Sequence, residues 1–262
     1  MEPLTNKNYF DIENQRRYWS VSQFKAFSNC EAEAMAELIG WQREETTALL
    51  VGSYVDAWFS GEMDDFLMKH SSIISSRTGE LKSDYKHADT IIEQIEDQPL
   101  LMEYLTGDKQ VIRTAELFGV PWKIKMDVYL PDKRIVDLKV VKDFKPLYKE
   151  GYGMVDWIQY WGYDIQGAVY QKVEQLSANR AEPLPFYIVA ATKEKVPDVA
   201  LIHIPQHILD AALKVVEHKI DRFDLVKEEM IEPERCEKCD YCKATKLIKG
   251  AVEYELREGG DN

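Results

Sequence analysis

The feature that most constrains the fold is a change of hydrophobic period at the centre of the chain. Apolar and polar residues alternate over 122–130, and after Pro131-Asp132 they alternate again over 134–141. Alternation sends successive side chains to opposite faces of a β-strand, so the even-numbered residues from Trp122 to Leu130 are expected to share one face. Because the turn between these segments is short, the strands should pair antiparallel. With an alternating segment at 111–118, the centre predicts a three-stranded meander.

Segments with helical period lie on both sides of this centre. Ser20 and Gln23 form a capping-box signature, followed by apolar residues at helical spacing. Residues 1–19 and 62–82 are polar and predict an irregular arm and an exposed loop. The pattern predicts an α+β (α/β) fold with a small central mixed sheet flanked by helices. The predicted helices are 20–38, 47–59, 83–105 (interrupted at Pro99), 154–177 and 206–229, and the further strands are 186–192 and 199–204.

Length and composition indicate a single domain without membrane segments. The 262 residues suffice for one substantial core, so we predict one domain over 1–262. It divides into an N-terminal helical segment (20–105), a core (110–230) and a C-terminal cysteine segment (231–262). No apolar run reaches about 18 residues and the N-terminus is polar, so we expect a cytoplasmic location and no membrane partner. The net charge of −13 argues against general coating of nucleic acid but permits a local DNA-binding groove.

Asp127, Asp137 and Lys139 form the candidate catalytic group. Asp127 lies on the polar face of the second predicted strand, and the other two are two residues apart on the third, so they project from one face. Two converging carboxylates repel unless a cation lies between them, and Mg²⁺ or Mn²⁺ prefers such oxygen ligands. Lys139 could then orient water or stabilise charge on a phosphate. The alternative is a surface hairpin whose Asp and Lys residues have no function. Two charged residues on a central strand favour a functional site instead, because burying charges is costly.

The run GVPWKIKMDVYLPDKRIVDLKVVKDF resembles the core of the PD-(D/E)xK nuclease superfamily. Asp127 matches the first acid of the pattern and Asp137-Leu138-Lys139 matches D/E-x-K. Gln166 and Tyr170 match a Gln-x-x-x-Tyr motif, and a spacing of four puts both on one helix face. The resemblance implies a restriction-endonuclease-like core and a metal-dependent deoxyribonuclease. Its implied metal ligands are Asp127 and Asp137, with Gln166 and Tyr170 positioning water or the DNA backbone.

Two further acids are candidates through the same resemblance. GSYVDAWFSG resembles a segment in which many relatives carry Gly-Ser-x-x-His, and Asp56 stands in place of the histidine. A carboxylate can also ligate a metal, so Asp56 is a candidate third ligand. Glu116 fits an acidic position seen in some relatives, with a solvent-facing strand residue as the alternative.

The segments YWSVSQFKAFSNCEAEAMAEL and CEKCDYCKATK resemble a narrower group, the phage and prophage RecE-like exonucleases (exodeoxyribonuclease VIII-like). This resemblance implies an exonuclease that resects double-stranded DNA ends for phage-type recombination. It implies linear duplex ends as substrate, a single-strand annealing protein as partner and a homo-oligomeric ring. The alternatives are an endonuclease or single-strand nuclease of the same fold, and a non-catalytic DNA-binding recombination scaffold.

Cys30, Cys236, Cys239 and Cys242 are the four cysteines of the chain. Three of them in Cys-x-x-Cys-x-x-Cys spacing plus one remote cysteine are typical of a [4Fe–4S] site. The plan resembles that of AddB-type and CRISPR-associated adaptation nucleases, which place one cysteine before and three after the nuclease core. Zn²⁺ or free thiols are the alternatives. In each metal-bound case the site would join the two ends of the chain and take no part in catalysis.

A group of aromatic residues follows the lysine strand. Trp157, Tyr160 and Trp161 could stack on DNA bases. Their helical spacing favours core packing instead. Tyr152, between two glycines, is the better candidate for a contact beside the site.

Overall fold

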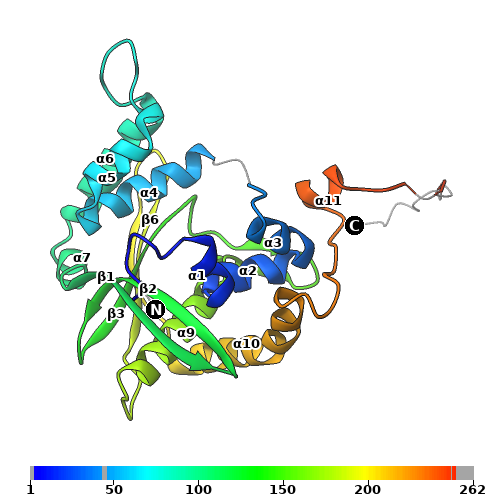
Figure 1. Cartoon of the computed structure of the whole chain (residues 1–262). Helices are drawn as coiled ribbons and strands as arrows, with labels where there is room; N and C mark the ends of the chain where they lie inside the picture. The colour runs from blue at the N-terminus through cyan, green and yellow to red at the C-terminus, as the bar shows by residue number, and fades with distance from the viewer. Residues whose placement is uncertain (1–2, 43–45, 249, 252–262) are drawn as a thin grey trace, which may run out of the picture.

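The computed structural model describes residues 3–42, 46–248 and 250–251. Its central sheet has five strands in the order β1-β2-β3-β6-β7 (Figure 1). β3 and β6 are parallel neighbours, and the other neighbours are antiparallel. The predicted mixed sheet and its antiparallel meander are confirmed. The strands are β1 (Asp108–Leu117), β2 (Val120–Leu130), β3 (Arg134–Val141), β6 (Phe186–Thr192) and β7 (Val199–His203).

Helices α2 (Val21–Asn29), α9 (Tyr163–Ser177) and α10 (Gln206–Lys227) pack on one face of the sheet. Ser20 caps α2, since its hydroxyl accepts a hydrogen bond from the Gln23 amide at 3.3 Å, as the capping signature predicts. The core on this face consists mainly of aromatic and branched residues, including Phe24, Phe27, Trp122, Ile124, Met126, Val169, Val173, Val216 and Ile220.

Helices α4 (Thr47–Ser60), α6 (Ser83–Glu96) and α7 (Pro99–Tyr104) cover the other face, and Figure 1 shows them opposite α9 and α10. Gly61 ends α4 in the left-handed conformation, and Pro99 separates α6 from α7, both as predicted. The second core contains Leu50, Val55, Ile91, Ile95, Val128, Val136, Leu138 and Val189.

β2 changes face at Asp127. Met126 belongs to the first core and Val128 to the second, although regular alternation would put both on one face. The expectation of one continuous apolar face to Leu130 is therefore wrong beyond Met126. The irregularity lies at the residue that the sequence marks as catalytic.

Two polar segments contain structure that the sequence analysis missed. Residues 1–19 include α1 (Ile12–Arg17), and residues 62–82 include α5 (Met63–Lys69) and a 3-10 turn at Ser71–Ile73. Phe66 and Ile73 are buried among α4 and α6. In each of these segments, burial of one or two apolar residues is enough to order a stretch whose average composition predicts a loop.

Two predicted helices are each divided. Cys30 adopts an extended conformation with φ −164° and separates α2 from α3 (Glu31–Leu38). The predicted helix 154–177 comprises a strand, α8 (Trp157–Tyr160) and α9, divided at Gly162, whose φ is +63°. That strand, β5 (Gly153–Val155), pairs with β4 (Leu147–Lys149) in a small hairpin. Over the described ranges, no helix combines the length and apolarity required to cross a membrane.

Candidate active site

The site lies where β2 separates from β3. The β2–β3 pairing ends at the pair Val128–Val136, one step before Asp127 would face Asp137. Instead the Asp127 carboxylate accepts a hydrogen bond from the Leu138 amide at 2.9 Å. β3 continues beside β6 over its whole length, through the pair Val141–Thr192. The two strands therefore diverge at the two acids and open the sheet between them.

Asp137 is held on three sides. Its side chain is buried, and its Oδ1 accepts a hydrogen bond of 2.7 Å from the Gln166 amide on α9. Its Oδ2 forms an ion pair of 2.5 Å with the Lys139 ammonium. The carboxyl group of Asp127 lies within hydrogen-bonding distance as well. Asp127, Asp137 and Lys139 therefore converge as the spacing predicts, and Gln166 joins them as the family resemblance implies. Tyr170, one turn further along α9, has its ring edge against Phe186.

The electrostatics of this group are those of acids held together out of water. Burial raises the pKa of Asp137 to about 7, and the Asp127 charge adds to the rise while Lys139 opposes it. Burial by itself lowers the pKa of Lys139, but the Asp137 and Asp127 carboxylates outweigh it and raise that pKa above its usual value. The ammonium therefore stays charged and partly neutralises the pair.

Asp56 approaches from the opposite face of the sheet, on α4. It lines a cavity of about 10 Å³ together with Asp127, Lys109 and Gln110, which is the space of about one water molecule. Burial and the Asp127 charge raise the pKa of Asp56 to about 7. Asp127 is thus flanked by Asp56 from one core and by Asp137 from the other.

The donor set fits a hard divalent cation. Asp127 and Asp137 offer converging carboxylate oxygens, and Asp137 Oδ2 is buried beside the Lys139 ammonium. Asp56, Asp127 and Asp137 are not all gathered within one ligand sphere, because among the described residues only the four cysteines form such a group. The Asp127–Asp137 pair is therefore the core of the candidate metal site, and Asp56 is peripheral to it.

Gln110 is a site residue that the sequence analysis missed. It stands opposite Asp127 in the β1–β2 register, between the pairs Lys109–Val128 and Val111–Met126. Its side chain is 5% exposed, and neither polar atom of its amide has a hydrogen-bond partner among the described residues. Its φ of 52° is unusual for a residue with a side chain. A glutamine between Lys109 and Val111 gives no sequence signal for such a position.

Lys25 is a second missed residue. It lies on α2, and its Nζ is 5.2 Å from the centre of the Tyr163 ring, while Lys139 Nζ is 5.3 Å from the same centre. Burial, with a contribution from Lys139, lowers the pKa of Lys25 to about 8. Only packing of α2 against α9 brings this lysine to the site.

Glu116 does not reach the site. It is exposed on β1 and pairs with Pro121, six residues along the strand from Gln110. The β1–β2 ladder fixes this separation, because a strand rises about 3.3 Å per residue. The structure therefore agrees with the alternative interpretation, in which Glu116 is a solvent-facing strand residue.

The four cysteines converge in a separate place. Their sulfur atoms all lie within 4.8 Å of one another, and they join the α2–α3 break to the C-terminal segment around α11 (Asp240–Ala244). Figure 1 shows α11 beside α3. This arrangement agrees with the prediction from the sequence that Cys30 joins the three C-terminal cysteines.

The fold and the Asp-Asp-Lys site together define a nuclease of the PD-(D/E)xK type. Residues 20–245 match the family described as a PDDEXK-like domain of unknown function (DUF3799), and the chain belongs to that family. A crystal structure of a protein from Eubacterium rectale, provisionally named an exonuclease, is similar at 43% sequence identity. The similarity covers 97% of each chain with a TM-score of 0.91. The comparison with curated proteins gives no match.

Proposed function

We propose that the protein is a Mg²⁺-dependent deoxyribonuclease, with Mn²⁺ as a substitute, that resects the ends of linear duplex DNA. The observation that carries the proposal is the convergence of Asp127 and Asp137 beside the buried end of Lys139. The family membership and the similarity to a provisionally named exonuclease support it. A divalent ion at the two carboxylates would activate water and neutralise charge on the scissile phosphate.

Each residue of the site has a role that its contacts suggest. Asp127 and Asp137 are the proposed metal ligands, and Asp56, which is peripheral to this pair, is proposed as a third that reaches the ion only by moving toward it. Gln166 donates to Oδ1 of Asp137 and so fixes the carboxylate with Oδ2 directed at the site. Lys139 places a charged donor next to Oδ2, where it can contact a phosphate oxygen or the attacking water. Tyr170 is proposed to guide the DNA backbone.

Hydrolysis of end-labelled linear duplex DNA with Mg²⁺ tests the proposal. Asp137→Asn and Lys139→Met should each lower kcat by at least about 100-fold, the usual effect of removing one group that stabilises transition-state charge. Glu217→Ala, an exposed position on α10, is the matched control and should leave kcat unchanged. Full activity in either site variant would refute the assignment.

The choice of an exonuclease acting in phage-type recombination rests on the RecE-like resemblance and the provisional name of the E. rectale protein. A linear duplex and its closed circular form separate the alternatives: an exonuclease degrades only the linear form, and an endonuclease cuts both. Light scattering tests the proposed homo-oligomeric ring, and co-purification tests the proposed single-strand annealing partner. A catalytically silent DNA-binding scaffold predicts no hydrolysis of any substrate.

A further inference from the structure

The cysteine site has dimensions that discriminate between a cluster and a single ion. Cys30 Sγ lies 3.6 Å from Cys242 Sγ and 3.8 Å from Cys239 Sγ. All four sulfurs, including that of Cys236, lie within 4.8 Å of one another. The sulfurs thus form a compact group in which no two are more than 4.8 Å apart.

A tetrahedral ion with metal–sulfur bonds of about 2.3 Å holds its sulfurs about 3.8 Å apart. A cubane cluster is larger, because four irons stand between the thiolates and keep the outer sulfurs roughly 6 Å apart. The cluster suggested by the cysteine spacing does not fit a group of this size. We infer that Cys30, Cys236, Cys239 and Cys242 hold one Zn²⁺ ion.

The backbone around the sulfurs is arranged for thiolates. The Lys238 and Cys239 amides donate to Cys236 Sγ at 3.4 and 3.3 Å, and the Cys242 amide donates to Cys239 Sγ at 3.4 Å. Backbone amide donors favour the charged thiolate form of a cysteine. Thiolates are the form that binds Zn²⁺.

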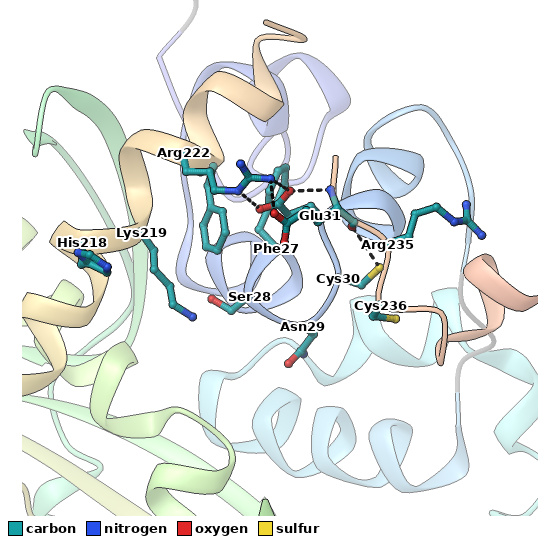
Figure 2. A pocket seen from close by; sticks show the side chains of 12 residues that line it. Phe27, Ser28, Asn29, Cys30, Glu31, His218, Lys219, Arg222, Arg235 and Cys236 are labelled. Carbon is teal, nitrogen blue, oxygen red and sulfur yellow. Dashed lines mark hydrogen bonds and ion pairs between the residues drawn. The ribbon is translucent and has the colours of Figure 1, made fainter. Parts of the chain in front are cut away.

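The surrounding contacts fix the two chain segments that supply the ligands. Figure 2 shows Cys30 close to Cys236, with Glu31 held by Arg222. Arg222 donates to both Glu31 oxygens at 2.8 and 3.0 Å, and the Glu234 amide donates to Glu31 at 2.7 Å. Arg235 donates to the Cys242 carbonyl at 2.6 Å. A Zn²⁺ ion here would join the α2–α3 break to the C-terminal segment.

Metal analysis of the full chain purified anaerobically tests the inference. We expect one zinc per chain, negligible iron and labile sulfide, and no visible colour. Exchange with Co²⁺ should give the visible bands of a tetrahedral cobalt thiolate. Four irons and four sulfides per chain with brown colour would overturn the inference, and so would stable protein free of both metals.

Two variants locate the ion. Cys236→Ser should lose most of the bound zinc, whereas Asp137→Asn at the candidate active site should keep it. Retention of zinc by Cys236→Ser would overturn the assignment. If that variant does not fold, the cobalt spectrum of the unaltered protein still decides the ligand set.

A second observation concerns a groove beside the active site. It has a volume of about 780 Å³ and is lined by residues of α2, the β4–β5 hairpin and the α8–α9 junction. Lys25 and Tyr163 line the groove, and the centre of the Tyr163 ring lies 5.2 Å from Lys25 Nζ and 5.3 Å from Lys139 Nζ. The groove therefore leads to the candidate catalytic lysine.

The outer wall of the groove carries exposed aromatic residues. Tyr148 is 68% exposed on β4 and Trp161 is 47% exposed after α8, in contrast to the buried Trp157. Lys149 lies beside Tyr148, and the acid of the groove, Glu150, is paired with Lys238 at 2.6 Å. Aromatic faces next to ammonium groups are what a single nucleic-acid strand requires.

We infer that this groove binds the unpaired end of a DNA strand and directs it to Lys139. Its volume is that of a pocket for a small molecule, which suits one or two nucleotides. Bases would stack on Trp161 and Tyr148, and phosphates would meet Lys25 and Lys149. The inference rests on the proposed nuclease function and adds the form of the bound substrate.

Binding of a fluorescein-labelled thymidine oligonucleotide, followed by anisotropy in EDTA, tests the groove without cleavage. Trp161→Ala should weaken binding by about 5- to 150-fold, the usual effect of losing one stacked base, and Trp161→Phe should restore most of it. Trp58→Ala is the matched control, since Trp58 is also 47% exposed but lies on α4. Equal binding by Trp161→Ala and the unaltered protein would overturn the inference.

The two proposals can fail separately. Loss of oligonucleotide binding in Trp161→Ala, together with no hydrolysis by the unaltered protein, would reject the nuclease and support the groove. Hydrolysis that depends on Lys139, together with unchanged binding by Trp161→Ala, would reject the groove and support the nuclease.

Discussion

Gly167 is a position where α9 packs tightly against β6 and α10, and its replacement by alanine gives a sharp test of the site's construction. A Cβ at Gly167 would stand 2.6 Å from Phe186 Cδ1 and 2.9 Å from Leu209 Cδ2. Neither ring nor branched side chain can yield freely, because both are buried. Insertion of one methyl group into such packing costs about 1–3 kcal/mol, and the clash places Gly167→Ala near the upper end.

Helix propensity acts in the opposite direction. Alanine is favoured over glycine by about 1 kcal/mol inside a helix, so Gly167→Ala should lower the free energy of unfolding by about 2 kcal/mol. Gly52→Ala on α4 is the matched control, since a Cβ at Gly52 has no atom within 4 Å. It should raise the free energy of unfolding by up to about 1 kcal/mol. The two substitutions are chemically identical and opposite in expected sign.

Urea denaturation of both variants measures the difference. In a thermal melt, Gly167→Ala should lower Tm by about 4–8 °C. Because Gln166 is the adjacent residue and donates to Asp137 at 2.7 Å, displacement of α9 should also reduce nuclease kcat. An increase in stability of Gly167→Ala equal to that of Gly52→Ala would refute the close packing of α9 on β6 and α10.

Other predictions concern single contacts. Tyr129→Phe removes the 2.7 Å hydrogen bond to the buried Glu174 carboxylate and should lower unfolding free energy by about 1.5–3 kcal/mol in urea. Burial lowers the pKa of Lys227 to about 7, so between about pH 7 and pH 10 the unfolded chain binds one more proton than the folded chain, and the free energy of unfolding of the unaltered protein should rise with pH. Lys227→Met should abolish this rise in urea titrations. A rise that persists in the variant would show that another group is responsible. Glu116→Ala should leave kcat unchanged, and a large loss would return Glu116 to the site.

Local sequence patterns predicted most elements of the nuclease core. Alternation located β1, β2 and β3, the two further predicted strands correspond to β6 and β7, and the Asp-x-Lys spacing placed Asp137 and Lys139 on one face of β3. Capping and breaking residues such as Ser20, Gly61 and Pro99 fixed helix ends because they act within one turn. The polar segment 62–82 was missed because its folding depends on burial against α4 and α6.

The sequence by itself determined the strands, the antiparallel meander and the group of Asp127, Asp137 and Lys139, whereas Gln166 was identified through the family resemblance. These features follow from residue type, hydrophobic period and turn length, which can be read from short stretches of the chain. Only the tertiary structure decided that β2 parts from β3 at Asp127, because that divergence depends on β3 pairing with the distant β6. It also decided the places of Gln110 and Lys25, and the size of the cysteine group, which are set by packing between segments far apart in the chain.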